Sequence, residues 1–511
     1  MKLCDDMSKL DTAAKIQKVM KTGRKLDIGT LKKPDGSYTE TTEESLKVLL
    51  DTHFPDETKP EHEEPLDFTG NVNNLDIDKV INLEAVRASV KSFKPYKSPG
   101  KDNIYPALLQ QGLDIIENDI LALYRKCLRE GKSPGIWLET RVAFIPKPGK
   151  KDYTNANNTR PISLSSYFTK GLERILCWHL NETLLNEKLD KDIFSYRESV
   201  GCEDAIHSLI KRIEKALEND QVCVVLFLDM SAAFNTASIN GMVNCLEKFG
   251  AEKEILTWTE HMLKNRTVIA QINEDTATKI VNRGCPQGGL KSTILWNGLK
   301  QELKDRLPRG GPTWLSAYAD DSFNISVGKY IRECVKKLQK DIPILEGWAD
   351  DFGLKFNPTK TKAMLFTKQR NPIKPDLTMY GENIEWVTEH TYLGVKISEN
   401  LNWKSHIKHI AQKATYTMMN CRKMMSRTWG LNPRISRWMY TSLVRPIMTY
   451  ASFIWIKSTE VKLHMKIVRK VQRRGCLSIL NAMHTTPTAG MEIMLDILPI
   501  QIHLKMMAIG I

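Results

Sequence analysis

Long apolar runs, a secretory signal and paired cysteines are all missing from this sequence of 511 residues. No apolar stretch approaches the ~20 residues that a helix needs to cross a bilayer, and the longest, residues 222–228, has only strand length. The amino-terminal residues MKLCDDMSKL lack the apolar core of a secretory signal. The ten cysteines form no C-x-x-C pair, which argues against a zinc ribbon and a secreted disulfide framework. We therefore expect a protein of a reducing compartment that does not cross a membrane.

Positive charge is concentrated at the carboxy-terminal end. The net charge is +14, and residues 399–511 hold 17 Lys+Arg against 4 Asp+Glu, whereas the remaining residues hold 57 against 56. The chain is long enough for several structural units, and its 41% apolar and 26% charged residues are typical of a globular protein. We expect a polyanionic partner to bind the carboxy-terminal region. A solvated basic helical surface is the alternative.

Strand and helix patterns are mixed in the middle of the chain, and the carboxy-terminal part is helical, which predicts an α+β fold. Strands are predicted at residues 141–148, 222–228, 318–327 (a hairpin) and 363–366. Helices are predicted at residues 10–50 (broken by a turn at 33–36), 78–93, 202–218, 237–264, 329–352 and 404–480. Residues 54–76 are acidic and contain prolines, as in a linker.

Three aspartates stand at the ends of predicted strands. Asp229 follows the apolar run 222–228, and Asp320 and Asp321 lie side by side in the predicted hairpin. Adjacent carboxylates repel each other, and a bound cation offsets that repulsion. If the three met at one point, they would hold two Mg²⁺ ions for phosphoryl transfer. Read singly, an Asp-Asp pair is an ordinary turn and Asp229 an ordinary strand end.

The segments around these aspartates resemble the motifs of reverse transcriptases. Residues 318–321 (Tyr-Ala-Asp-Asp) resemble the family's catalytic tetrapeptide, and residues 227–234 (Phe-Leu-Asp-Met-Ser-Ala-Ala-Phe) resemble the block with its first catalytic aspartate. Further motifs occur in the family's order at residues 145–149, 160–164 and 284–289 (Gly-Cys-Pro-Gln-Gly-Gly). Residues 53–55, 98–102, 194–197, 392–394 and 484–489 are similar to motifs of the non-LTR, jockey-like subgroup. The chain is therefore identified as a suspected member of that subgroup.

The resemblance implies a right hand of fingers, palm and all-helical thumb. We expect an amino-terminal helical extension and acidic linker at 1–76, fingers and palm at 77–398, and a basic thumb at 399–511. The implied activity is that of an RNA-directed DNA polymerase, which extends a DNA primer on an RNA template with dNTPs. The implied cofactors are two Mg²⁺ ions, with Mn²⁺ as a substitute.

The resemblance also assigns roles to individual residues. It implies that Asp229, Asp320 and Asp321 bind the metals and that Lys360 protonates the leaving pyrophosphate. The implied nucleotide-binding residues are Lys147 and Arg160 at the triphosphate, Phe234 beneath the sugar, where it excludes a 2′-hydroxyl, and Gln287 near the sugar and base. An ammonium and a guanidinium suit phosphate oxygens. The ordinary alternatives are surface charges for the cations and a core position for the aromatic ring.

A basic helical face is predicted in the thumb. Five cations recur at helical spacings of three and four: Lys466, Arg469, Lys470, Arg473 and Arg474. Such a face is suited to tracking a nucleic-acid backbone without base specificity. The neighbouring Trp429, Trp438 and Trp455 are interpreted as core residues.

Several positions depart from the family's pattern. They are Ser195, Asn235, residues 290–293 (Leu-Lys-Ser-Thr), Ser322 and Asn324. None removes a predicted metal ligand, but together they favour a second hypothesis, a catalytically decayed nucleic-acid-binding relic. An RNA-dependent RNA polymerase and a two-metal nuclease would share the carboxylates, but Phe234, residues 284–289 and the finger motifs argue against them.

The resemblance also implies domains that we do not expect in this chain. Full-length relatives carry an endonuclease before the polymerase, and some carry a ribonuclease H after it, so we expect a truncated element. Residence in the nucleus and cytoplasm is likewise an expectation from the family. The oligomeric state is left open.

Overall fold

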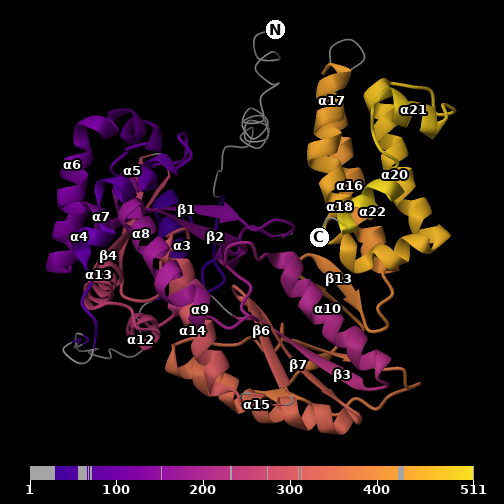
Figure 1. The fold of residues 1–511 in the computed structure, drawn as a ribbon, viewed down its shortest axis with the longest axis horizontal. Coiled ribbons are helices and arrows are strands. Elements are labelled where there is room, and N and C mark those ends of the chain that lie inside the picture. The colour runs from indigo at the N-terminus through magenta and orange to yellow at the C-terminus, as the bar shows by residue number, and fades with distance from the viewer. Residues whose placement is uncertain are drawn as a thin grey trace.

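The computed structural model describes residues 29–55, 66, 68, 72–150, 152–230, 233–272, 274–308, 310–311, 313–423 and 431–509. Figure 1 shows a mixed α+β molecule in which two sheets and their helices lie on the left and at the bottom, and a helical unit stands at the upper right. We use the words fingers, palm and thumb for these three units. The start of the predicted helix at 10–50 lies outside the described residues. Residues 29–41 form a turn and a bridge instead of a helix.

The palm is built on a five-stranded sheet with the order β11-β8-β3-β7-β6. Its strands are β3 (Val222–Leu228), β6 (Thr313–Tyr318), β7 (Asp321–Gly328), β8 (Lys362–Phe366) and β11 (Glu385–Trp386). β3 lies at the centre, antiparallel to β7 and β8, and all of its residues are buried. A strand covered on both faces is normally apolar throughout, which accounts for the uninterrupted apolar run of β3.

Helices cover both faces of this sheet. Val224 and Leu226 belong to the core on the side of α12 (Ile239–Phe249), α14 (Lys291–Arg306) and α15 (Ile331–Asp351). Val225 and Phe227 belong to a second core, shared with α10 (Cys202–Glu218) and the thumb. Alternate residues of β3 therefore belong to different hydrophobic cores, one on each face of the palm sheet.

The fingers contain a four-stranded sheet with the order β2-β1-β4-β5. Its strands are β1 (Glu139–Pro146), β2 (Thr159–Leu164), β4 (Arg266–Ile272) and β5 (Asp275–Val281), and the sequence patterns predicted only the first of them. α3 (Thr42–His53) packs on this sheet through Leu46, Leu49 and Leu50. This part of the expected amino-terminal extension thus packs with the fingers. The boundary at residue 76 stays a prediction.

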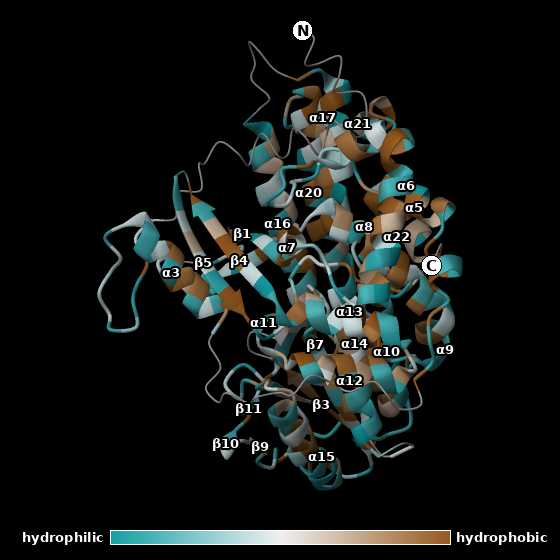
Figure 2. Cartoon of the chain, turned by 90° about the vertical axis from the view of Figure 1, so that its left-hand side faces the viewer, coloured by the Kyte–Doolittle hydropathy of each residue, from teal (hydrophilic) through white to brown (hydrophobic). Residues whose placement is uncertain are grey.

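Further helices pack against one another on the left of Figure 1. They are α4 (Ile77–Val80), α5 (Leu83–Lys91), α6 (Pro106–Glu130), α7 (Gly135–Leu138), α8 (Tyr167–Leu180) and α13 (Lys253–Lys264). The helices in Figure 2 carry brown apolar and teal polar residues on different sides. That pattern is the signature of helices that bury one side against a neighbour.

The thumb is reached through the hairpin β12 (Glu389–Tyr392) and β13 (Val395–Ser398). Its helices are α16 (Lys404–Arg422), α17 (Pro433–Met439), α18 (Arg445–Thr449), α19 (Ser452–Trp455), α20 (Lys462–Leu480), α21 (Thr488–Met494) and α22 (Ile500–Ile509). Trp455 is fully buried, as predicted, Trp438 is half-buried, and Trp429 lies outside the described residues. In the part of the chain that is described, no helix is sufficiently long and apolar to traverse a bilayer.

Candidate active site

The three predicted aspartates meet at one end of the palm sheet. Asp229 directly follows β3, Asp320 lies in the turn between β6 and β7, and Asp321 is the first residue of β7. Leu228 pairs with Ser322, so the residues next to them, Asp229 and Asp321, stand beside each other on neighbouring strands. The turn is tight, since Tyr318 pairs with Asp321 and Ala319 adopts a left-handed φ of 53°. The structure thus brings together carboxylates that are about ninety residues apart in the sequence.

Electrostatic repulsion marks this group of carboxylates. The pKa of Asp321 is raised to about 6, first by removal from water and then by the negative charges of Asp320 and Asp229. Lys300 opposes this rise. One carboxylate oxygen of Asp229, Oδ2, is buried and accepts no hydrogen bond. Mg²⁺ prefers hard oxygen ligands such as these carboxylates. A bound cation would also offset their mutual repulsion.

The aspartates do not form a complete metal cage by themselves. Within the described ranges, no group of three His, Cys, Asp or Glu side chains is close enough to enclose an ion. This is consistent with magnesium sites that take one or two carboxylates from the protein and the remaining oxygens from substrate phosphates. The donor set therefore fits Mg²⁺ in chemistry but leaves coordination positions to a ligand.

Three predicted cations gather around Asp229. The Nζ of Lys360 lies 3.5 Å from Asp229 Oδ2. The pKa of Lys147 is lowered by burial and by the positive charges of Arg160, Lys360 and Lys150, whereas Asp229 raises it. The mutual repulsion of these cations shows that Lys147, Arg160 and Lys360 share one neighbourhood. An anion with several charges, such as a triphosphate, would relieve that repulsion.

The fingers sheet and an amino-terminal histidine hold these cations in place. Arg160 lies in β2 opposite Ile145 of β1, and the Lys147 ammonium donates to the carbonyl of Asn157 at 2.7 Å. His53 hydrogen-bonds through Nε2 to Thr159 Oγ1 at 2.8 Å, directly beside Arg160. Burial lowers the pKa of His53 to about 4, so the ring is neutral. The sequence identified His53 only as part of a motif, and the structure shows that it fixes the start of β2.

Phe234 of the short helix α11 (Ala233–Thr236) and Gln287 lie on two segments that are joined by hydrogen bonds. The Cys285 amide donates to the Phe234 carbonyl at 2.8 Å, and the Phe234 ring stacks on Trp296 with centroids 4.9 Å apart. Gly284 has a φ of 65°, and a Cβ there would lie 2.4 Å from the Phe234 carbonyl oxygen, so only glycine fits. The Gln287 carbonyl accepts from the amide of Ser163 in β2. These bonds join the loop at 284–289 to the block that contains Asp229.

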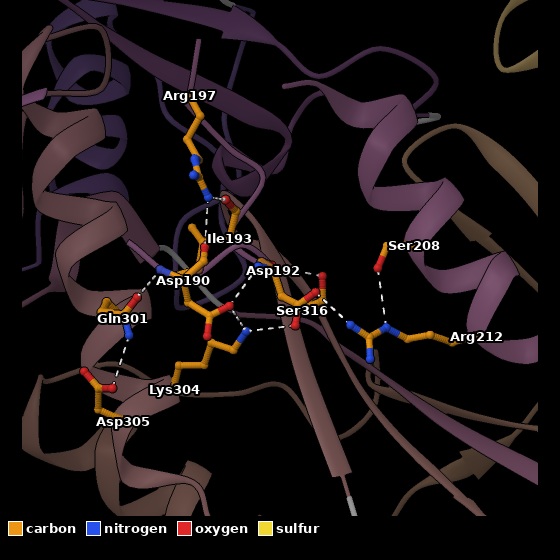
Figure 3. Close-up of polar contacts among 10 residues, drawn as sticks. All are labelled: Asp190, Asp192, Ile193, Arg197, Ser208, Arg212, Gln301, Lys304, Asp305 and Ser316. Atoms are coloured by element: carbon orange, nitrogen blue, oxygen red, sulfur yellow. Dashed lines mark hydrogen bonds and ion pairs between the residues drawn. The ribbon is translucent and has the colours of Figure 1, made fainter. Parts of the chain in front are cut away.

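Residues 190–197 bring a tyrosine to the aspartates. Figure 3 shows the polar network that holds this segment, in which Lys304 contacts Asp190 and Asp192, and Arg212 bonds to Asp192 at 2.8 Å. A parallel bridge from Ile193 to Ala317 adds the segment to the edge of β6. The pKa of Tyr196 is raised by burial and by the charge of Asp320. Sequence reasoning assigned Tyr196 no role, although it lies in the quoted motif at 194–197.

A second residue that sequence reasoning missed is Lys300 of α14. It is 1% exposed, and its Nζ donates to Ser322 Oγ at 2.9 Å, beside Asp321. Nothing in its sequence context distinguishes it from a surface lysine, because its partner lies 22 residues further along the chain.

Most departures from the family pattern are buried and paired. Ser195 donates to Asn297 Oδ1 at 2.9 Å, and Asn297 returns a bond to the Ser195 carbonyl. Asn324 donates to the buried Asp341 at 2.7 Å. Lys291 of residues 290–293 is also buried and hydrogen-bonds to Thr259. Nothing in the structure explains Asn235.

The basic face predicted in the thumb divides into two groups. Arg473 donates to the carbonyl of Thr486 and to Thr488 Oγ1, and Arg469 bonds to Gln501, so both serve the thumb's own packing. The other three, Lys466, Lys470 and Arg474, are exposed on α20. Lys470 and Arg474 border a hollow between α16 and α20 that Lys408, Tyr416 and Met419 also line.

Comparison with known protein families agrees with this geometry. Residues 145–397 match the family described as reverse transcriptase (RNA-dependent DNA polymerase). Solved structures with a loose likeness include apo telomerase from Candida tropicalis, with a TM-score of 0.38 and 12% identity over 72% of this chain and 68% of that one. The matched residues include the fingers strands β2, β4 and β5 and the three aspartates, so they form a reverse transcriptase domain.

The chain is also similar in sequence to several curated proteins of retrotransposons. The chain is 26% identical, over 87% of its length, to a probable RNA-directed DNA polymerase from transposon BS of Drosophila melanogaster. It is also 26% identical, over 98% of its length, to a putative 115 kDa protein in the retrotransposable element R1DM of that species, and 23% identical to the polymerase of its mobile element jockey. It spans 50%, 47% and 49% of these relatives. Residues 145–397 therefore match the reverse transcriptase family, and the chain is similar over most of its length to proteins of non-LTR retrotransposons.

Proposed function

We propose that this chain is an RNA-directed DNA polymerase that joins dNTPs to the 3′-hydroxyl of a primer on an RNA template. The observation that carries the proposal is the meeting of Asp229, Asp320 and Asp321 at one end of the palm sheet, with the pKa of Asp321 raised to about 6. The names of the relatives support the same activity. Because the chain spans about half of their length, the activity of the complete proteins comes to it only as a proposal.

The three aspartates would hold two Mg²⁺ ions in this reaction. When bound, the ions would activate the attacking hydroxyl and offset the charge that develops on the phosphate. Lys147 and Arg160 orient the triphosphate and attract it to the end of the sheet. Lys360 lies 3.5 Å from Asp229 and is placed to donate a proton to the leaving pyrophosphate. Phe234 and Gln287 would bound the sugar side of the pocket.

The exposed cations of the thumb would bind the template–primer backbone. Lys466, Lys470 and Arg474 are exposed, whereas Arg473 is half-buried and donates to the carbonyl of Thr486. Contacts to phosphates are salt-dependent because they release counterions, so binding should weaken steeply as the salt concentration rises. Residence in the nucleus and cytoplasm remains a proposal based on the family alone.

A primer-extension assay tests the proposal. The full chain, Mg²⁺, dNTPs and a primed RNA template are compared with an Asp320→Ala/Asp321→Ala variant. We expect extension by the first and none by the second. The matched control is Asp220→Ala, which removes an exposed acid at the opposite end of β3 and should leave extension unchanged.

The same assay separates the polymerase from the decayed relic. Failure of the unmodified chain to extend, with RNA still bound at low salt, would favour the relic and contradict the proposal. Extension that survives in the double variant would show that the aspartates are not the metal site. Ser195, Ser322 and Asn324 each form a hydrogen bond with a buried side chain, which argues against decay, although the Oδ1 of Asn324 is buried and accepts no hydrogen bond.

A further inference from the structure

A lysine lies buried beneath the aspartates of the palm. Lys300 projects from α14, and its ammonium group is enclosed by the rings of Trp296 and Trp348, at 5.2 and 5.8 Å from their centroids. Only 1% of the residue is exposed. Within the described part of the chain it forms no ion pair at salt-bridge distance. A buried lysine without a direct carboxylate partner is costly, so its surroundings must compensate for the charge.

Lys300 contacts the residues that follow Asp321 and Asp229 in the sequence. Its Nζ lies 2.9 Å from Ser322 Oγ and 3.2 Å from Met230 Sδ. Ser322 follows Asp321 in β7, and Met230 follows Asp229 at the end of β3. The ammonium group therefore lies under the junction of the two strands that present the aspartates.

The charge of Lys300 is coupled to those aspartates. Burial lowers the pKa of Lys300 to about 8, whereas the negative charges of Asp320 and Asp321 raise it. Lys300 in turn lowers the pKa of Asp321. At neutral pH the lysine is mostly protonated, and it is the cation that faces the carboxylates from inside the protein.

We propose that Lys300 is a built-in counter-cation of the candidate metal site, which weakens the binding of the first divalent ion until a nucleotide arrives. Its ammonium group offsets part of the negative charge of the aspartates from the interior of the protein. It also repels a divalent ion that approaches the aspartates from the solvent. A triphosphate brings the further negative charge that holds the metals. The inference rests on the proposed function, because it assumes that the three aspartates bind metal. Lys300 acts through the aspartates, so it is a positioning residue.

Direct binding of Mn²⁺ to the full chain without nucleotide tests this role. The free ion is measured by electron paramagnetic resonance for the unmodified chain, Lys300→Met and Asp320→Ala/Asp321→Ala. Methionine resembles lysine in length and removes the charge, so we expect Lys300→Met to bind the first ion about tenfold more tightly. A nucleotide should reduce this difference.

A second buried lysine on the same helix provides the matched control. Lys291 is 2% exposed and also has a pKa lowered to about 8, but its charged neighbours are Glu173 and Cys177 instead of the aspartates. Lys291→Met should therefore leave the affinity for Mn²⁺ unchanged. Circular dichroism and melting temperatures verify folding, and Lys300→Gln replaces Lys300→Met if the latter does not fold.

The outcomes separate the inference from the proposed function. If the unmodified chain binds Mn²⁺ no better than Asp320→Ala/Asp321→Ala, the metal site itself is absent. If the aspartates bind Mn²⁺ and Lys300→Met binds it equally or more weakly, Lys300 is not a counter-cation. Equal tightening by Lys291→Met would also overturn the inference, because a general loss of positive charge would then explain the effect.

Discussion

The two faces of β7 are both buried, yet one is polar and the other apolar. Phe323 and Ile325 face the core shared with α10 and the thumb, and both are 0% exposed. Ser322, Asn324 and Ser326 alternate with them and are at most 2% exposed. A strand in the middle of a sheet is normally apolar on both faces. Burial alone therefore does not decide which residues the palm accepts.

The polar face is accepted because each residue on it has a partner on a covering helix. Ser322 bonds to Lys300 of α14, Asn324 to Asp341 of α15, and the Ser326 hydroxyl to the Cys334 thiol of α15. A buried polar group costs little when its hydrogen bond is formed and much when it is not. Two of the departures from the family pattern, Ser322 and Asn324, are thus members of buried hydrogen-bonded pairs.

The apolar face should give the largest loss of stability when it is truncated. Phe323→Ala removes a ring that meets Tyr392 edge-on with centroids 5.5 Å apart, and it leaves a cavity that two strands and a helix cannot close. We expect the free energy of unfolding to fall by about 3–5 kcal/mol. Chemical denaturation followed by tryptophan fluorescence measures this. Val327→Ala, at a half-buried position of the same face, is the control and should cost clearly less.

An ionisable group on the apolar side should make stability depend on pH. His406 of α16 is 0% exposed and packs against Trp455, and burial lowers its pKa to about 4. The unfolded chain, with a pKa near 6.5, binds the proton first, so stability is complete above that pH and is lost as the pH falls towards 4. The loss from this residue approaches about 3 kcal/mol at pH 4.

A variant isolates the contribution of His406. His53 and His390 have pKa values lowered to about 4 as well, so the unmodified chain should lose stability from all three over the same interval. Denaturation at pH 7 and pH 4.5 should show a smaller difference for His406→Phe than for the unmodified chain. An unchanged difference would mean that His406 is accessible to protons in the folded thumb.

Removing one member of a hydrogen-bonded pair on the polar face should lower the stability strongly, and removing both members should lower it less. Asn324→Leu leaves the buried Asp341 carboxyl without its amide donor, which we expect to cost about 2 kcal/mol. Adding Asp341→Leu should restore part of the loss, because two apolar groups then face each other. Denaturation of both single variants and the double variant gives the coupling energy. Strictly additive losses would contradict the idea that the two residues form a unit.

The pairs also show where sequence reasoning reached its limit. Motifs indicate Asp229, Asp320 and Asp321, a continuous apolar run indicates β3, and apolar periodicity indicates α10, because these signals lie within short stretches of the sequence. The partners of Ser322 and Asn324 lie 22 and 17 residues away on helices, and a single sequence contains no signal for such a contact. Read from the sequence alone, these two departures therefore indicate decay.

The same limit applies to the fingers and the thumb. The strands β4 and β5 alternate weakly and were missed, although they complete the sheet that carries Arg160. Helical spacing placed five cations on one face of α20, but it could not show that Arg473 binds the carbonyl of Thr486. Periodicity predicts which residues share a face, and only the packing of the next segment decides what that face contacts.

The third pair on the polar face should contribute least, and it tests whether every member of the row matters. Ser326→Ala removes a hydroxyl from a neutral bond to Cys334, whose thiol also lies 3.9 Å from the Val222 carbonyl. The thiol is a weak partner and keeps a second acceptor, so we expect a loss of less than about 1 kcal/mol by denaturation. A loss as large as that for Asn324→Leu would mean that the three pairs act as one cooperative network. A loss near zero would mean that only the other two pairs, those of Ser322 and Asn324, contribute to the stability of the polar face.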